Sequence, residues 1–302
     1  MNKDTRNMII IVIVAGVVIV SIFGGISSAS GVSPFQTVVE SNSMQHGSES
    51  RIGVIDTGDV VILKNKDRVN IQTYVDGYHT GYKTFGMYGD VIIYDRVQAP
   101  GSKPLNPIIH RAILWLEYNY DGTWRAPSLE FYPYGTHWDC IVSETPSETV
   151  YTSDYMALSG KLILKKLGHA GDKEGSFYLS QLLEWPAMQG YITMGDNNHG
   201  LDQPNKITGV EGLIPLDRIR SVAWFEVPWV GAIKMELGGQ GADLRRYAPN
   251  TWGCLIAAIL LFTFSLVAVS FLFDLLYYKK VRKELSDEIN APTPIFPVEP
   301  KG

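Results

Sequence analysis

Two long apolar stretches without a charge constrain this chain more than any other feature of its sequence. Met8 to Ile26 covers 19 residues, and Trp252 to Phe273 covers 22. Because a helix rises about 1.5 Å per residue, each stretch is close to the length that crosses a bilayer core. We therefore expect a transmembrane anchor at 8–26 and a second transmembrane helix at 252–276. The alternative for the first stretch is a cleaved secretory signal, although the apolar run of such a signal normally covers only roughly 7 to 15 residues. The alternative for the second stretch is a buried core helix.

Basic residues flank each stretch on the side of the nearer chain end. Lys3 and Arg6 precede the first stretch, and K-K-V-R-K follows the second. By the positive-inside rule, both termini are cytoplasmic, at 1–7 and at 277–302, and the second of these ends in a proline-rich tail without regular structure. Residues 27–251 then form one extracytoplasmic domain of an integral protein of the cell membrane.

The composition narrows the classes of partner and cofactor. With 45% hydrophobic and 19% charged residues, the chain is too apolar for disorder. A formal net charge of -5, without an extended basic cluster outside the C-terminal segment, predicts no nucleic-acid partner. The two cysteines, Cys140 and Cys254, are too few for a disulfide framework or a four-ligand zinc site. We expect neither a metal nor another cofactor.

The segment between the two stretches has the pattern of antiparallel β-sheets. Short runs rich in β-branched and aromatic residues alternate with turns of Gly, Asp, Asn and Pro. We expect a hairpin and further strands at 51–55 with 60–64, 90–97, 107–118, 191–194 and 214–234. From about 119 to 190 the pattern weakens, which predicts an α/β or irregular insertion with short helices at 162–167 and 178–185. The predicted fold class is mainly β, flanked by two transmembrane helices.

The candidate catalytic residues are a pair of serines and one histidine. Ser41 and Ser43 lie in S-N-S-M-Q-H-G, shortly after the first apolar stretch. A serine hydroxyl becomes a good nucleophile only when a positioned base accepts its proton. His110 lies on the best-patterned strand, 107–118, where a period of two places it on the apolar face. Both features also have ordinary interpretations, because S-x-S pairs occur in loops and a histidine on such a face is commonly a core residue.

Four short motifs, in a fixed order behind the anchor, resemble those of a known family. S-x-S-M comes first, G-D-V begins at Gly58, and H-R begins at His110. G-D-N-N then contains Asp196 and is followed by Asp202. This order is similar to that of type I signal peptidases, in particular the archaeal and endoplasmic-reticulum branch, in which histidine stands where bacterial members carry the catalytic lysine. The resemblance implies the antiparallel β-sheet fold of these signal peptidases.

The resemblance also implies a role for each candidate residue. Ser43 is implied as the nucleophile, and His110 as the general base that later protonates the leaving amine. Asp202 is implied to orient and stabilise the imidazolium, and Asp196 to give structural or electrostatic support. The Ser41 hydroxyl and the backbone N–H of Ser43 are implied to form the oxyanion hole, in which each donor contributes on the order of 3 to 4 kcal/mol.

The implied function is that of a membrane-bound serine endopeptidase that removes N-terminal signal peptides from exported preproteins at the outer membrane surface. Its implied partners are these preproteins, the lipid bilayer and the secretion translocon. Substrates of the family present small residues at the first and third positions before the cut, and no cofactor is needed. Since an ordinary histidine has a pKa of about 6.5 and a base must be neutral, activity is expected to fall below about pH 6.

Three features depart from the family pattern. Gln45 and His46 follow Met44 where the family usually has proline, which predicts a less rigid loop. His199 lies close to the G-D-N-N motif and is a competing base. The insertion at 119–190 has no counterpart in the endoplasmic-reticulum members, so its role is open.

Two other functions are compatible with the sequence. If the serines and acids form ordinary turns, the chain is a non-catalytic, membrane-anchored β-domain that binds a partner. If Lys64 or Lys83 is the base, it is a Ser–Lys membrane hydrolase. In the Ser–Lys hydrolase, a lysine in place of His110 accepts the proton of Ser43. In the binding module, no group accepts it.

One strand is a candidate for contact with lipid. V-A-W-F-E-V-P-W-V, at 222–230, is rich in aromatic residues, which favour the membrane interface. We expect this strand to enter the bilayer surface through side chains such as Trp229, with packing in the β core as the alternative.

Overall fold

The structure, a computed structural model, describes residues 3–97, 101, 103, 105–203, 209–210 and 212–289. Its residue contacts divide the chain into two units, Met1–Trp252 and Gly253–Gly302. The predicted proline-rich tail lies outside the described residues from residue 290 onward. The described part is mainly antiparallel β-sheet with two long apolar helices, as the sequence predicts.

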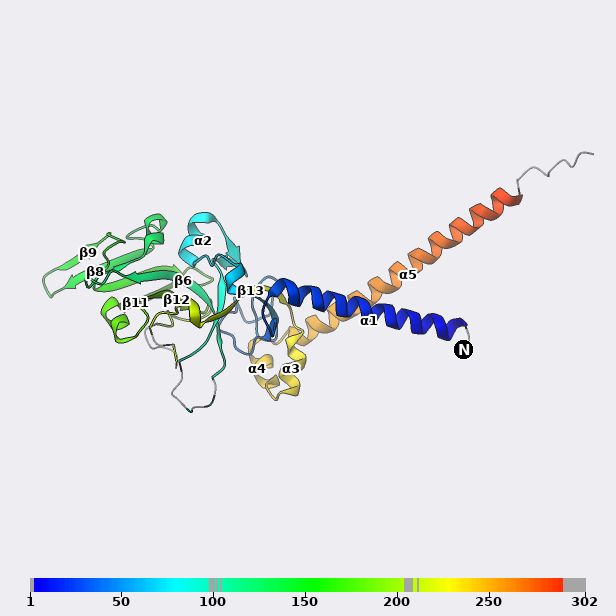
Figure 1. The fold of residues 1–302 in the computed structure, drawn as a ribbon, viewed down its shortest axis with the longest axis horizontal. Helices are drawn as coiled ribbons and strands as arrows, with labels where there is room; N and C mark the ends of the chain where they lie inside the picture. Colours follow the sequence, from blue (N-terminus) through cyan, green and yellow to red (C-terminus); the bar gives the residue numbers. More distant parts are fainter. Residues whose placement is uncertain are drawn as a thin grey trace, which may run out of the picture. The chain divides into compact units, whose positions relative to one another are not determined.

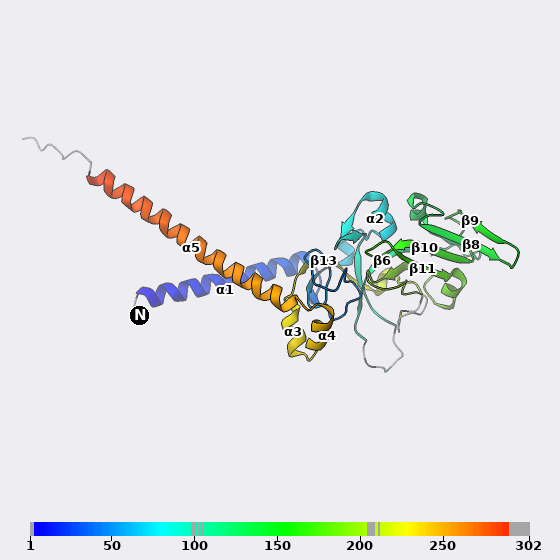
Figure 2. The same ribbon diagram turned by 180° about the vertical axis from the view of Figure 1, so that it is seen from behind.

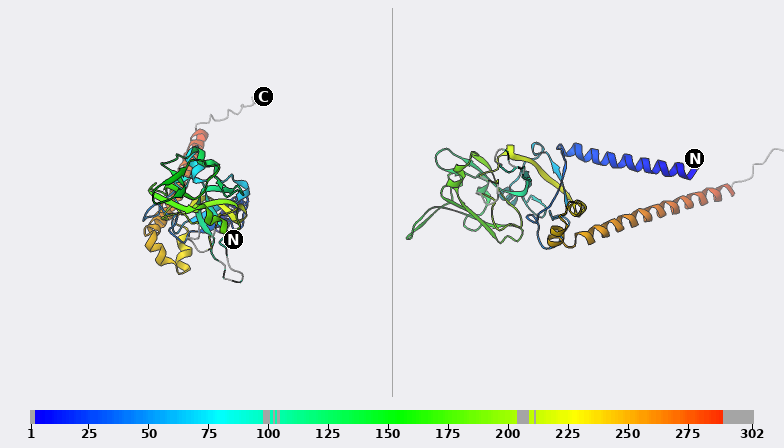
Figure 3. Two further views of the ribbon diagram at one scale, coloured as in Figure 1. Left: turned by 90° about the vertical axis from the view of Figure 1, so that its left-hand side faces the viewer. Right: turned by 90° about the horizontal axis from the view of Figure 1, so that it is seen from below.

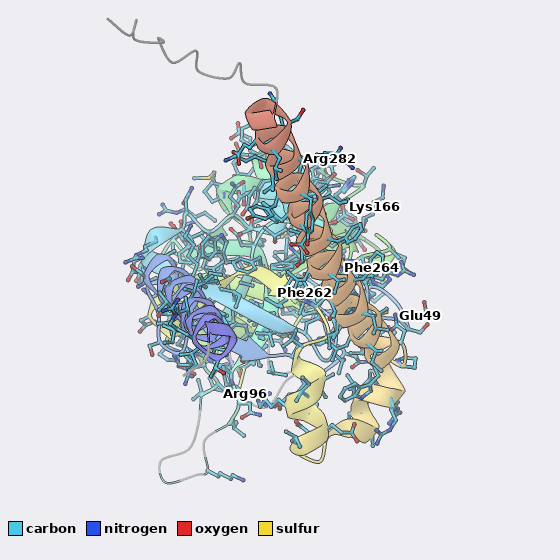
Figure 4. All side chains as sticks on the ribbon, turned by 90° about the vertical axis from the view of Figure 1, so that its right-hand side faces the viewer. Glu49, Arg96, Lys166, Phe262, Phe264 and Arg282 are labelled. Carbon is cyan, nitrogen blue, oxygen red and sulfur yellow. The ribbon has the colours of Figure 1, made fainter. Side chains whose placement is uncertain are left out.

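The two apolar stretches form α1 (Lys3–Ser30) and α5 (Thr251–Ile289), each one continuous helix (Figure 3). Within them, Val12–Ser30 and Thr251–Ser286 are long and apolar enough to cross a membrane. Both helices are longer than the predicted spans, and α5 extends through 277–289, which the sequence assigns to the cytoplasmic segment. Phe262 and Phe264 are among the large apolar side chains that project from α5 (Figure 4). A helix that is apolar all round is typical of a membrane span.

The first sheet has seven strands, and the pairs between them are antiparallel. Six follow the order β1 (Gln36–Val38), β2 (Val60–Lys64), β13 (Ile219–Val227), β5 (Val91–Tyr94), β6 (Ile108–Tyr118) and β12 (Gln189–Met194) (Figure 1). The seventh, β7 (Trp124–Arg125), pairs with β6. The strands predicted at 60–64, 107–118 and 191–194 are confirmed, whereas those predicted at 90–97 and 214–234 are shorter than expected.

The predicted hairpin of 51–55 with 60–64 is wrong. β2 pairs with β1, and residues 51–55 form turns instead of a strand. Carboxylates satisfy the main chain of these turns, because Asp56 accepts a hydrogen bond from the N–H of Arg51 and Glu226 accepts one from the N–H of Gly53. The edge of the sheet beside β2 is therefore β1, the strand that leads to the serine pair.

The insertion contains a second sheet of four antiparallel strands, in the order β11 (Lys173–Tyr178), β10 (Lys161–Leu167), β8 (Trp138–Glu144) and β9 (Thr149–Thr152) (Figure 2). The predicted α/β or irregular character of this segment is therefore wrong. The helix predicted at 162–167 is part of β10, because its apolar residues are buried at the period of two that defines a strand. The helix predicted at 178–185 is a short 3-10 helix, η3 (Leu179–Glu184).

Short elements complete the first unit. Three are α-helices and three are 3-10 helices: α2 (Tyr74–Thr80), α3 (Gly231–Leu237), α4 (Gly241–Tyr247), η1 (Lys66–Arg68), η2 (Pro127–Phe131) and η4 (Leu216–Arg218). A separate two-stranded sheet pairs β3 (Lys83–Thr84) with β4 (Met87–Tyr88). A capping box between Thr73 and Asp76 satisfies the first N–H groups of α2 and fixes where this helix begins.

The two sheets share a large buried apolar cluster. The cluster joins side chains of β6 and β12 to side chains of β8, β10 and β11, among them Leu114, Ile192, Trp138, Leu162 and Phe177. Apolar burial is the dominant favourable term in folding. The insertion is therefore packed into the same unit as the first sheet.

The C-terminal end of α1 is tied to the chain that follows β2. The N–H of Asn65 donates to the carbonyl of Ser30 at 2.8 Å, and the Arg68 guanidinium donates to the carbonyl of Ser28 at 3.0 Å. These bonds satisfy carbonyls that a helix leaves unpaired at its C-terminus. The first sheet thus begins directly where the candidate span of α1 ends.

The aromatic residues of 222–230 divide into an exposed pair and a turn residue. Trp224 and Phe225 are 40% and 36% exposed, and their rings are in contact. Trp229 is half-buried, with a left-handed backbone at φ 66° and a buried indole N–H. The main chain at Trp229 turns to donate a hydrogen bond to Asp59, and the contact of its side chain with lipid stays a prediction.

Candidate active site

His110 and Asp202 form a buried pair at the centre of the first sheet. β6 holds His110 opposite Ile92 of β5, and Asp202 is tied to β12 by a hydrogen bond from its N–H to the carbonyl of Thr193. The Nδ1 atom of His110 lies 2.6 Å from Oδ2 of Asp202, and the two side chains are only 5% and 1% exposed. A carboxylate in this position holds the proton on Nδ1 and leaves Nε2 as the acceptor.

Two hydroxyl groups complete the surroundings of Asp202. Tyr94 and Thr193 each donate to the same Oδ2 atom, at 3.0 and 2.8 Å. Burial raises the pKa of Tyr94 well above its ordinary value, so its hydroxyl stays protonated and can donate. These contacts fix the orientation of the carboxylate, and through it the orientation of the His110 ring. Sequence reasoning missed both residues, although the continuous apolar run of D-V-I-I-Y-D signals that Tyr94 lies in a buried strand.

The loop that carries the serine pair is held by side chains on both sides of it. Met44 is buried in a cluster with Ile55, Val61 and Ile93. Gln45 donates to the carbonyl of Tyr247 at 2.9 Å and accepts from the Thr57 hydroxyl at 2.9 Å. These contacts hold Met44 and Gln45 in place, and the expectation of a less rigid loop stays a prediction.

Ser43 and His110 lie close together. A Cβ atom built on Gly195 would lie 2.6 Å from the carbonyl oxygen of Ser43 and 2.9 Å from Nε2 of His110. These two atoms are therefore no more than 5.5 Å apart, the sum of those distances. The glycine of G-D-N-N is required at this point, since any side chain would enter the space between the serine loop and the imidazole.

Both serines line a cavity of about 430 Å³ together with His110, which we call the site cavity. Residues 37–41 and residues 106–110 line most of this cavity. Ser43 Oγ makes a hydrogen bond of 3.2 Å with Ser41 Oγ. Among the described residues, no backbone carbonyl accepts a hydrogen bond from the backbone N–H of Ser43. A free N–H and a neighbouring hydroxyl are the donors that an oxyanion hole needs.

Asp196 has a different partner and therefore a different role. Arg111, next to His110 on β6, binds both oxygens of this carboxylate, at 2.7 and 2.6 Å, and a third nitrogen of Arg111 donates to the carbonyl of Gly89. Burial would raise the pKa of Asp196, but the charge and hydrogen bonds of Arg111 outweigh it and lower that pKa to about 2. Asp196 is an anion held by arginine, which fits a supporting role and leaves Asp202 to orient the imidazole.

The turn that follows Asp196 holds the serine loop. The N–H of Asn197 donates to the carbonyl of Ser43 at 2.8 Å, and its side-chain amide donates to the carbonyl of Asn42 at 3.0 Å. His46, which sequence reasoning set aside, also reaches this turn, with Nε2 3.0 Å from a carboxylate oxygen of Asp196. The motif G-D-N-N therefore supports the serine loop as well as lying beside His110.

The competing bases lie elsewhere. His199 is exposed and lines another cavity but not the site cavity. Lys64 and Lys83 lie over the rings of Trp224 and Tyr88 and do not line the site cavity. Lys234 does line it, but its ammonium group binds Glu40 at 3.0 Å. Among the residues of this cavity wall, His110 is the group placed to accept a proton from serine.

Within the described part of the chain, no three His, Cys, Asp or Glu side chains come together as a metal site requires. No family model matches the chain, and no curated protein or solved structure matches it significantly. The function must therefore be argued from the geometry of the site and from the four motifs.

Proposed function

We propose that this protein is a membrane-bound serine endopeptidase that removes signal peptides from exported preproteins, as the resemblance to type I signal peptidases implies. The observation that carries the proposal is the buried pair of His110 and Asp202, because His110 lines the site cavity together with Ser43 and its Nε2 atom lies within 5.5 Å of the Ser43 carbonyl oxygen. A chance core histidine has no reason to combine an orienting carboxylate with access to a serine loop.

The geometry supports a sequence of proton transfers. Rotation of the Ser43 side chain from Ser41 toward Nε2 of His110 lets the imidazole take the hydroxyl proton as Oγ attacks the scissile carbonyl. Asp202 stabilises the imidazolium, while the Ser43 N–H and the Ser41 hydroxyl donate to the developing oxyanion. The imidazolium then protonates the leaving amine. In the second step His110 takes a proton from the water that attacks the acyl-enzyme and returns it to Ser43 Oγ.

The surroundings of the site fit an extended peptide that leaves the membrane. β1 is an edge strand, to which a substrate segment can add by main-chain hydrogen bonds. The site cavity beside it includes the apolar side chains of Val39, Met44 and Ile93, which suit small residues before the cut. Ser43 follows Ser30, the last residue of α1, by only 13 positions, so the nucleophile lies within about 45 Å of the end of that helix even on an extended chain.

Replacement of the nucleophile tests the proposal. Ser43→Ala is expected to lower the rate of preprotein cleavage by on the order of 10⁶-fold. Ser48→Ala, an exposed serine of the same loop, is the matched control and should cleave at the rate of the natural protein. Undiminished cleavage by Ser43→Ala would place the chemistry elsewhere. Binding of an uncut preprotein by the natural protein would favour the non-catalytic module.

The identity of the base is tested separately. Lys64→Ala and Lys83→Ala should retain activity, whereas a Ser–Lys hydrolase would lose it with one of them. Because a histidine base must be neutral, the cleavage rate is expected to fall as the pH drops below about 6. A rate that stays constant from about pH 5 to pH 8 would contradict histidine as the base.

A further inference from the structure

The insertion reaches the candidate active site through the loop between β10 and β11. Lys173, the first residue of β11, donates from Nζ to the carbonyl of Asp196 at 2.9 Å. The ring of His169, in the same loop, stacks on the ring of His46 with 5.2 Å between centroids. The backbone N–H of His169 donates to the same carbonyl at 3.4 Å. This loop of the second sheet therefore contacts the turn that holds Ser43.

A second cavity opens between this loop and the serine loop. Its volume is about 410 Å³, and we call it the loop cavity; it is lined by Asn42, His169, Ala170, Asp172, Lys173, Asn197, Asn198 and His199. Asn198 also lines the site cavity, and Asn42 directly precedes Ser43. The two cavities therefore meet beside the candidate nucleophile.

The two cavities offer different chemistry to a bound chain. The site cavity follows the edge strand β1 and includes apolar side chains, whereas the loop cavity is lined mainly by amides, imidazoles and one ammonium group. A peptide cut at Ser43 has the residues before the cut on one side of the serine and those after it on the other. Because the apolar side suits small residues before the cut, the residues after it face the loop cavity.

We propose that the loop cavity is the subsite for the residues that follow the scissile bond, and that it selects acidic or amide side chains over basic ones. The inference rests on the proposed peptidase function and specifies its substrates. Six of the eight side chains that line the cavity carry a nitrogen that can donate a hydrogen bond, namely three amides, two imidazoles and the Lys173 ammonium, against one carboxylate, that of Asp172. The Asp196 carboxylate does not change this balance, because Arg111 binds both of its oxygens.

An incoming carboxylate therefore meets the Lys173 ammonium and the side-chain amides of Asn42 and Asn197. A lysine at the same position meets a like charge in a partly enclosed space, which disfavours it. The insertion thus acquires a role that the first sheet cannot supply, since the polar wall of the cavity at residues 169–173 belongs to the second sheet.

A pair of substrates tests the subsite. The full-length protein in liposomes is given two preprotein peptides that differ only in Glu or Lys at the first two positions after the cut. The natural protein is expected to show a kcat/KM about fivefold higher for the Glu peptide, as for a partly exposed charge pair. Lys173→Glu should invert the preference, and Lys173→Met should bring the ratio close to one. Lys161→Glu, at the opposite end of β10, changes the net charge equally and should leave the ratio unchanged.

The ratio of kcat/KM for the two peptides distinguishes a subsite from a purely structural role of Lys173. If Lys173 only holds the carbonyl of Asp196, Lys173→Glu slows both peptides by the same factor, and the subsite is overturned. If the natural protein cleaves neither peptide, the proposed peptidase function fails and the subsite fails with it. Cleavage of both peptides with a ratio that Lys173→Glu does not alter contradicts the subsite alone.

Discussion

Both sheets bury apolar side chains, but they differ in the ionisable side chains that they bury. Around β5, β6 and β12 the first sheet buries ionisable groups, including Asp90, His110, Arg111, Asp196 and Asp202. The strands of the second sheet instead bury apolar groups such as Trp138, Cys140, Leu162, Leu164 and Phe177. Buried charges are expensive and need partners.

The raised pKa values of buried acids in the first sheet show that burial disfavours their charged forms. Burial raises the pKa of Asp59 to about 8, and it raises the pKa of Asp90, despite hydrogen bonds that act in the opposite direction. A fold that needed only stability would place apolar residues there. The comparison therefore predicts that substitutions in the first sheet's polar network mainly change activity, and that substitutions in the second sheet mainly change stability.

Loss of the orienting carboxylate should have the largest effect. Asp202→Asn is expected to lower the cleavage rate by on the order of 10⁴-fold, because the amide stabilises the wrong tautomer of His110 and no longer supports an imidazolium. Tyr94→Phe, which removes one donor to the same oxygen, should cost only about tenfold. Single-turnover cleavage of a preprotein measures both. Comparable rates for Asp202→Asn and the natural protein would remove this carboxylate from the mechanism.

Asp196→Asn should be the exception in the polar network of the first sheet, because it should mainly lower stability. It leaves the buried Arg111 without its anion, which is expected to cost about 3 to 5 kcal/mol of unfolding free energy at pH 7. Because the folded pKa of Asp196 is lowered from 3.8 to about 2, its contribution is fully present above about pH 4 and is lost as the pH falls through about 2. The stability difference between the two proteins should therefore narrow in acid.

Thermal unfolding in detergent at a series of pH values checks the effect at Asp196. Glu226→Gln, at an acid of the first unit whose pKa burial raises, is the control for acid sensitivity in general. A difference that stays constant from pH 7 to about pH 2 would show that Arg111 does not depend on the charge of Asp196.

A core substitution in the second sheet should show the opposite pattern. Leu164→Ala removes a buried side chain of β10 and is expected to cost about 2 to 5 kcal/mol of unfolding free energy. The cleavage rate measured well below the unfolding temperature should change little. Tyr151→Ser, at a half-exposed position of β9, is the matched control and should cost less than about 0.5 kcal/mol. A large loss of activity in the folded Leu164→Ala protein would contradict the division between the sheets.

The same contrast explains which features the sequence can predict. β6 is long and strongly patterned, so its limits and the burial of His110 follow from a period of two. The partners of Asp202 do not, because Tyr94 and Thr193 reach it only through the register of β5 and β12 on either side of β6.

The second sheet was harder to predict for a related reason. In K-L-I-L-K-K-L, Ile163, Leu164 and Leu167 fit a helical spacing, whereas Leu162 and Leu164 fit a strand. A bulge between Leu164 and Leu167 then interrupts the alternation of the strand. Its contact with the candidate active site involves single residues of a loop, His169 and Lys173, and no local pattern signals where a loop will dock.

The smallest expected effect concerns the surface of the first sheet beside α1. Lys64, at the end of β2, lies 5.0 Å from the centre of the Trp224 ring, and the next residue, Asn65, binds the end of α1 at Ser30. If α1 spans the bilayer, the exposed Trp224 lies at the interface, where aromatic rings are favoured. No comparable link to a candidate span exists for the exposed Tyr151 of the second sheet among the described contacts.

Trp224→Ser should therefore weaken the binding of residues 31–250 to liposomes, whereas Tyr151→Ser should not. Since Trp224 is 40% exposed, transfer of its free surface into lipid contributes about 1.5 to 2.5 kcal/mol, which corresponds to roughly ten- to seventyfold in the partition coefficient. Sedimentation with liposomes measures that coefficient. Equal weakening by both substitutions would mean that the two sheets do not differ in their approach to the membrane. Weakening by Trp224→Ser alone would assign the interface to the sheet that also holds the candidate active site.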